Sequence, residues 1–117
     1  MSASRLLHNP RCSKSRAALA LLQERGIDVE VLPYLDQPPS ADELRTLLAQ
    51  LGIGPRDLLR SGEPEFSALG LDDPNIGDDA LIAAMASHPK LIERPVFAHR
   101  GRAVVGRPPE RVLELLD

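Results

Sequence analysis

The sequence predicts an α/β fold, in which a mixed four-stranded sheet is interrupted by a helical insertion. Three observations support this prediction. A strand, a helix and a second strand follow one another near the start of the chain. The middle third has helical spacing and no strand pattern. The last part has two short strands followed by a closing helix.

The first part of the chain has the pattern of a βαβ unit. Residues 5–8 are predicted to form a short strand that ends at an Asn-Pro turn. Residues 13–25 place apolar side chains at helical spacing, and Gly26 suits the left-handed position that ends a helix. Alternating apolar residues predict a second strand over residues 28–34. Two strands joined by one helix are expected to run parallel.

The middle third, about residues 38–93, is predicted to be a helical insertion. Ser40 and Glu43 have the spacing of a capping box, and leucines at helical spacing follow as far as Gly52. A short helix is expected over residues 56–60.

The second half of the insertion has a weaker pattern. Residues 61–77 are rich in Gly, Pro, Asp and Ser, and the pattern leaves their secondary structure undecided. Asp78 can cap a further helix that continues to His88 and is ended by Pro89.

The end of the chain returns to β structure. Residues 96–99 and 102–105 flank Arg100-Gly101, which suits a two-residue hairpin turn. Two prolines at 108 and 109 suit the first turn of a closing helix. Its apolar face is expected to contain Val112, Leu115 and Leu116. This order of elements is that of a thioredoxin-like domain with a helical insertion.

Length and composition exclude several classes of protein. A chain of 117 residues fits one compact domain, so we expect residues 1–117 to form a single domain. A net charge of −3 with only 3% aromatic residues argues against a nucleic-acid interface. No apolar run reaches the ~18–20 residues of a membrane span, so we expect no membrane contact.

The cysteine content indicates a reducing compartment. Cys12 is the one cysteine of the chain, so it cannot form an internal disulfide. The segment before residue 8 is too short and too mixed for a signal peptide. We therefore expect a cytoplasmic protein with a reduced thiol. With three histidines and one cysteine, we expect no metal site.

Cys12 is the candidate reactive group. It lies between the first strand and the first helix, where open α/β folds place their ligands. Unpaired backbone N–H groups at a helix start stabilise a thiolate and can bind an oxyanion beside it. Arg11, Lys14 and Arg16 add positive charge nearby. His8 is a candidate for orienting or deprotonating the thiol, although a histidine at a strand end is often structural.

The spacing around Cys12 excludes two other chemistries. A phosphatase loop has an arginine after five intervening residues, where this chain has Ala18. A dithiol motif has a second cysteine at the position of Ser15. An adduct or disulfide formed at Cys12 must therefore be resolved by an external thiol.

The motif His-Asn-Pro-x-Cys-x-x-Ser-Arg at residues 8–16 resembles that of the glutaredoxin-linked arsenate reductase (ArsC) family. The resemblance extends from residue 7 to residue 116. It includes Leu58-Leu59-Arg60, the stretch from His88 to Pro95, and Gly106-Arg107-Pro108.

The resemblance implies a mechanism and a set of site residues. Cys12 would attack arsenate, glutathione would add as a co-substrate, and glutaredoxin would reduce the arsenic so that arsenite leaves. Three guanidiniums would neutralise the oxyanion and keep the thiol ionised. The matching catalytic residues are Cys12, Arg60, Arg94 and Arg107. The residues expected to bind substrate or activate the thiolate are His8, Arg11, Ser15 and Arg16. Pro95 matches the cis-proline of the family.

Two other functions remain open at this point. The same cysteine would serve a thiol oxidoreductase that acts on a glutathione or protein mixed disulfide. Similar domains of the Spx type bind RNA polymerase and sense oxidation, but they usually carry a cysteine pair that Ser15 would break. The expected partners are arsenate, glutathione and glutaredoxin, and we expect a monomer with no bound cofactor.

Overall fold

The computed structural model describes residues 4–116, and the chain in it divides into two compact units. The first unit extends to Gln37 and resumes at Arg94, whereas the second is Pro38–Glu93. The second unit covers the residues that the sequence marks as a helical insertion. No helix of the described residues is long and apolar enough to cross a membrane.

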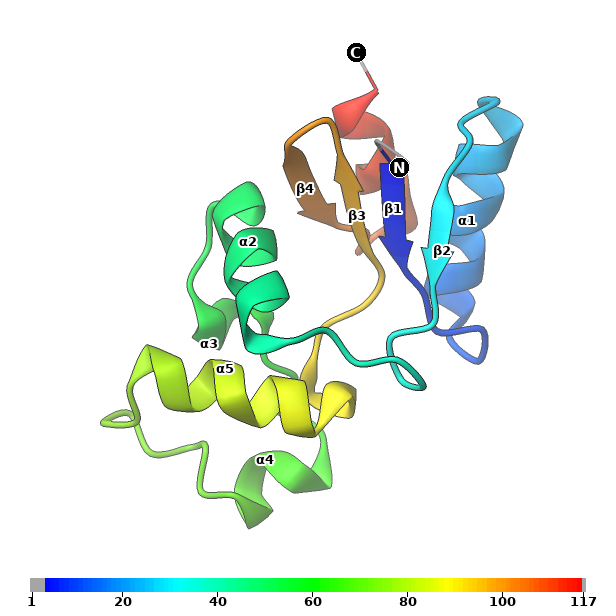
Figure 1. Cartoon of the computed structure of the whole chain (residues 1–117). Helices are drawn as coiled ribbons and strands as arrows, with labels where there is room; N and C mark the ends of the chain where they lie inside the picture. Colours follow the sequence, from blue (N-terminus) through cyan, green and yellow to red (C-terminus); the bar gives the residue numbers. More distant parts are fainter. Residues whose placement is uncertain (1–3, 117) are drawn as a thin grey trace. The chain divides into compact units, whose positions relative to one another are not determined.

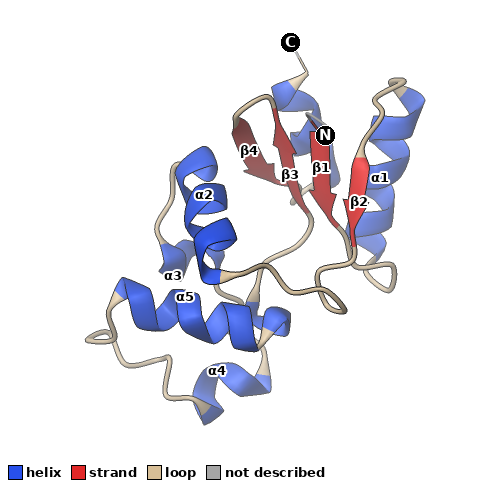
Figure 2. Ribbon diagram, in the orientation of Figure 1, coloured by secondary structure: helices blue, strands red, loops and turns tan. Residues whose placement is uncertain are grey.

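The first unit is built on a mixed four-stranded sheet (Figures 1 and 2). Its strands are β1 (Ser4–Leu7), β2 (Glu30–Leu32), β3 (Val96–His99) and β4 (Arg102–Val105), in the order β2-β1-β3-β4. β1 pairs in parallel with β2, whereas the β1–β3 and β3–β4 pairs are antiparallel. This arrangement confirms the predicted fold class.

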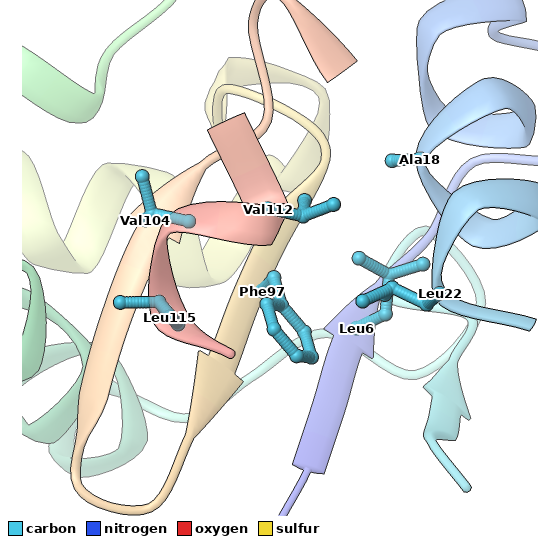
Figure 3. Packing of buried hydrophobic residues seen from close by; sticks show 7 residues of the cluster. All are labelled: Leu6, Ala18, Leu22, Phe97, Val104, Val112 and Leu115. Carbon is cyan, nitrogen blue, oxygen red and sulfur yellow. The ribbon is translucent and has the colours of Figure 1, made fainter. Parts of the chain in front are cut away.

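A helical layer covers one face of this sheet. α1 (Ser13–Glu24) and η2 (Pro109–Leu115), a 3₁₀ helix, pack against each other and share a core with the sheet. Figure 3 shows this core, which consists of Leu6, Ala18, Leu22, Phe97, Val104, Val112 and Leu115. The first strand, the hairpin and both helices therefore form one packed body, and the start of α1 lies at its edge.

The second unit is helical. Its elements are α2 (Ala41–Leu51), α3 (Pro55–Leu58), α4 (Pro64–Ala68), α5 (Asp78–Ser87) and η1 (Pro89–Leu91). α5 packs against α2, α3 and η1 through buried aliphatic side chains. α2 begins with the predicted capping box and ends at Gly52, which has the left-handed φ of +70°.

Several predicted boundaries of the elements are wrong, each for a local reason. β2 ends at Leu32, before the predicted residue 34, because Pro33 has no N–H and starts a turn. In this turn the Pro33 carbonyl accepts a hydrogen bond from Gln37 N–H. α3 ends before Arg60 because Leu59 forms an isolated bridge with Ile92.

The remaining differences are at helix ends. Gly77, not Asp78, is the N-cap of α5, and Asp78 lies in the first turn, where its charge suits the helix dipole. Pro64 starts a short helix, α4, inside residues 61–77, whose secondary structure the sequence pattern left undecided. The closing helix is a 3₁₀ helix that buries Val112 and Leu115 as predicted, whereas Leu116 is its C-cap and is only partly buried.

His99 is a buried polar residue at the end of β3. Its Nδ1 lies 2.6 Å from Ser4 Oγ, and its ring stacks on Phe97 with 5.5 Å between the ring centroids. Burial lowers the pKa of His99, and the nearby charges of Arg100 and Arg102 lower it further. The neutral imidazole is therefore the form that the folded protein favours.

Leu22→Ala should lower the free energy of unfolding by about 2–5 kcal/mol, because it opens a cavity in the core of the first unit. Leu69→Ala makes the same change at a side chain that is 43% exposed, and it should cost less than about 1 kcal/mol. Urea unfolding followed by circular dichroism measures both variants. Equal losses of stability in the two variants would contradict the burial of Leu22 and the exposure of Leu69.

His99 should make the protein less stable in mild acid. The unfolded chain binds the proton near pH 6.5, whereas the folded pKa lies lower, so stability is lost as the pH falls through this window. His99→Gln does not titrate and should show a smaller drop in urea midpoint between about pH 7.5 and about pH 5. An equal drop in the variant would show that His99 is not the source.

Candidate functional site

Cys12 is the N-cap residue of α1. Its backbone is extended, with φ −94° and ψ 121°, and its carbonyl accepts the first helical hydrogen bond, from Arg16 N–H at 3.0 Å. Its own N–H donates to the Asn9 carbonyl at 3.0 Å, which closes the turn after β1. The side chain is partly exposed, and the thiol is free. The cysteine therefore lies at the positive end of the helix dipole.

A network of hydrogen bonds holds the turn before Cys12. The buried Ser15 Oγ lies 2.6 Å from His8 Nδ1 and accepts from Asn9 N–H at 3.0 Å. The Asn9 side chain in turn accepts from Arg11 N–H at 3.0 Å. Because Ser15 lies on the first turn of α1, these contacts tie the end of β1 to the start of the helix. The network fixes the direction in which the turn presents Cys12.

The surroundings of Cys12 favour its thiolate. Partial burial by itself raises the pKa of the thiol. The N–H of Ser15, the side chain of Arg94 and the N–H of Lys14 all donate to the sulfur and outweigh burial, and the charge of Arg94 acts in the same direction. The pKa of Cys12 is therefore lowered from its ordinary value. Two of these donors are the backbone groups that a helix start leaves unpaired.

Arg94 and Arg107 belong to one cluster. Arg107 Nη1 donates to the Arg94 carbonyl at 3.4 Å, while the Arg94 side chain reaches the Cys12 sulfur. Arg107 N–H donates to the Val105 carbonyl at 2.9 Å, directly after β4. The peptide bonds before Pro95 and Pro108 are both cis. The structure thus brings two of the three predicted arginines into the same unit as Cys12.

The histidine and the other cations have distinct positions. Burial lowers the pKa of His8, and the charge of Arg16 lowers it further, so His8 is neutral at pH 7. Its ring contacts Ser15, and a direct effect of His8 on the thiol stays a prediction. Arg16 Nη1 donates to the Pro10 carbonyl at 2.8 Å, while Arg11 is exposed beside Cys12.

Arg60 lies in the second unit, between two carboxylates. Its Nη1 is 3.3 Å from Glu63 Oε1, and its Nε is 3.5 Å from Glu93 Oε1. All three side chains are between 22% and 27% exposed. The backbone is held as well, because Arg60 N–H donates to the Leu91 carbonyl at 2.8 Å. A role of Arg60 in binding the oxyanion stays a prediction.

Sequence reasoning expected backbone donors at the helix start but missed two carboxylates, those of Glu63 and Glu93, that contact Arg60. The backbone donors at Lys14 and Ser15 follow from the helix start, but their aim at the sulfur depends on the turn geometry. The i,i+3 spacing of Arg60 and Glu63 is a signal that could have found that ion pair. The contact of Arg60 with Glu93 had no such signal, because it depends on how residues 58–60 pair with residues 91–93.

Comparison with known proteins gives consistent results. The model of the ArsC family matches residues 7–115. An arsenate reductase of Neisseria meningitidis serogroup A is 50% identical over 113 residues, which cover 96% of this chain and 97% of that protein. Uncharacterized protein YfgD of Escherichia coli K12 is 48% identical, covering 96% of this chain and 95% of that one. The structure of an arsenate reductase from Vibrio cholerae matches with a TM-score of 0.93 and 50% identity over 96% of each chain.

Arg94→Gln should raise the pKa of the Cys12 thiol, because it removes a charged donor to the sulfur. The rate of alkylation by iodoacetamide as a function of pH measures this pKa. Arg111→Gln is the matched control, since that guanidinium pairs with Glu114 on the surface. An unchanged profile in Arg94→Gln would refute the contact between Arg94 and the sulfur.

Proposed function

Because the chain belongs to the ArsC family, we propose that it reduces arsenate to arsenite, with the Cys12 thiolate as the nucleophile. The observation that carries this proposal is the position of Cys12 as the N-cap of α1, where the backbone donors of the helix start and the side chain of Arg94 lower the pKa of its thiol. The same donors suit a tetrahedral oxyanion held beside the sulfur. The arsenate reductases of Neisseria meningitidis and Vibrio cholerae, both about half identical to this chain, support arsenate as the substrate.

The first step forms a sulfur–arsenic bond. The thiolate attacks As(V) of hydrogen arsenate, an arsenic–oxygen bond breaks, and two protons are taken up so that the oxygen leaves as water. Arsenic stays As(V) in the resulting adduct. Arg94 and Arg107 would stabilise the negative charge that gathers on the remaining oxygens. Arg60 of the second unit is proposed as the third guanidinium.

External thiols complete the reduction. We propose that glutathione replaces a second oxygen, which leaves as water, and forms another sulfur–arsenic bond. A glutaredoxin thiol then attacks the glutathione sulfur, so the two thiols end as a mixed disulfide and arsenic gains two electrons. Hydrolysis of the Cys12–As(III) bond releases arsenite and restores the thiol. This order fits a chain that has no second cysteine.

Exposed cations beside Cys12 support the use of glutathione. Arg11 and Lys14 flank the cysteine and are exposed, so they can attract the carboxylates of the tripeptide. Arg16, His8 and Ser15 would act by shaping the turn, because their hydrogen bonds lie within it. We propose that the protein works in the cytoplasm as a monomer, where glutathione keeps the thiol reduced.

A second candidate function uses the same activated cysteine. The lowered pKa of Cys12 would equally serve a thiol oxidoreductase that exchanges glutathione with mixed disulfides. In that reaction the thiolate attacks the disulfide, takes the glutathionyl group and expels a thiolate. Glutaredoxin would then remove glutathione from Cys12.

Arsenate turnover with glutathione and glutaredoxin tests the proposal. Cys12→Ser should lose activity completely, because the hydroxyl stays protonated and forms no stable arsenic adduct. Arg94→Ala should lower kcat/KM by about 10²–10³-fold, the range found when a donor to a developing oxyanion is removed. Arg60→Ala should raise KM for arsenate, because Arg60 is proposed as the third guanidinium that binds the oxyanion.

Three outcomes separate the alternatives. Full activity in Cys12→Ser would refute the proposed mechanism. Turnover without glutaredoxin would refute the order of thiol steps. A third outcome is that arsenate is not reduced, while Cys12 becomes glutathionylated and glutaredoxin removes the glutathione. The thiol oxidoreductase function would then replace the proposed one.

A further inference from the structure

Gly106 lies where the structure has no room for a side chain. A methyl group on this residue would be 2.9 Å from Pro95 Cγ and 3.0 Å from Val112 Cγ1, with Ala18 Cβ at 3.7 Å. Optimal contacts between carbon atoms are about 3.5–4.0 Å, so the first two distances are too short. The φ of Gly106 is outside the left-handed region, so backbone conformation does not explain why a glycine is needed here. The close packing of Pro95 and Val112 around this position explains it.

The neighbours of Gly106 are held in place. Gly106 N–H donates to the Pro95 carbonyl at 2.8 Å, so the two backbones are joined where the contact is tightest. Pro95 is followed by Val96, which pairs with both Leu7 and Val105 in the sheet. Val112 is fully buried in the core that Figure 3 shows, and Ala18 lies on α1 there. Added volume at Gly106 therefore has to separate packed segments.

The segments that meet at Gly106 carry the predicted reactive residues. Pro95 directly follows Arg94, whose side chain donates to the Cys12 sulfur. Gly106 directly precedes Arg107, whose guanidinium donates to the Arg94 carbonyl. Ala18 belongs to the helix that Cys12 caps. A shift of Gly106 should therefore move Arg107, to which it is bonded, and a shift of Pro95 should move Arg94 in the same way.

We propose that Gly106 is a positioning residue of the Cys12 site, because its missing side chain lets the Arg94–Pro95 and Gly106–Arg107 segments lie in contact and so places Arg94 beside the sulfur. This inference rests on the proposed function in one respect: it takes Cys12 as the reacting group. Gly106 touches no reacting atom and acts through Arg94.

Gly106→Ala tests this proposal, with Gly62→Ala as the matched control. A methyl group at Gly62 meets nothing within 4 Å, and the φ there is not left-handed. In Gly106→Ala the pKa of the Cys12 thiol should rise, so the alkylation rate should fall on the acidic side of the pH profile and the profile should shift to higher pH. Gly62→Ala should alkylate like the wild type.

A double-mutant cycle separates positioning from a general loss of stability. In an Arg94→Gln background, Gly106→Ala should cause no further fall in alkylation rate, because the group through which it acts is already absent. An equal fall in both backgrounds, or a folded Gly106→Ala with wild-type alkylation, would overturn the proposal.

A second variant keeps the test valid if Gly106→Ala does not fold. Gly106→Ala/Val112→Ala removes the Cγ1 atom at 3.0 Å but leaves the contact with Pro95, so it should fold and still alkylate slowly. Wild-type alkylation in this folded double variant would also overturn the proposal. Because iodoacetamide reports on the thiol without arsenate, a wild type that fails to reduce arsenate would refute the proposed function and leave this result unaffected.

Discussion

The hydrogen bonds that reach the Cys12 sulfur are the interaction on which the rest of the site depends. Burial of the thiol alone would raise its pKa, and donors from two different parts of the chain together outweigh that effect. The N–H groups of Lys14 and Ser15 come from the start of α1, whereas Arg94 comes from the segment before β3. A charged sulfur is therefore favoured both by the local turn and by the packing that brings β3 beside β1.

The turn before α1 links the sheet to this chemistry. Ser15 is fully buried and shares its hydroxyl between the His8 ring and the Asn9 N–H, so the helix cannot shift against the end of β1 without breaking these contacts. Losing a buried polar contact costs about 1–3 kcal/mol when a group is left without a partner. Ser15 thus occupies the place of a second cysteine while serving as a structural anchor, which fits the proposal that external thiols resolve the adduct at Cys12.

Opposite arrangements of charge surround the arginines of the two units. In the first unit, Arg94 and Arg107 lie in one cluster with a thiol whose ionised form they favour. In the second unit, Arg60 lies between Glu63 and Glu93, which together carry more negative charge than the guanidinium neutralises. An anion that binds Arg60 has to compete with these carboxylates. The predicted role of Arg60 in binding an oxyanion would therefore be opposed by Glu63 and Glu93.

The sequence by itself determined most of the order of the elements and the candidate nucleophile, Cys12. The helical spacing of α1, the capping box of α2, the hairpin turn and Cys12 at a helix start all depend on residues a few positions apart, and such local patterns can be read directly. Residues 61–77 lacked a pattern, so α4 was missed. Only the tertiary structure decided that Arg94 donates to the sulfur, that the Arg107 guanidinium donates to the Arg94 carbonyl, and that Gly106 packs closely against Pro95 and Val112. These contacts join segments far apart along the chain, and their geometry follows from how the hairpin, η2 and α1 pack on one core.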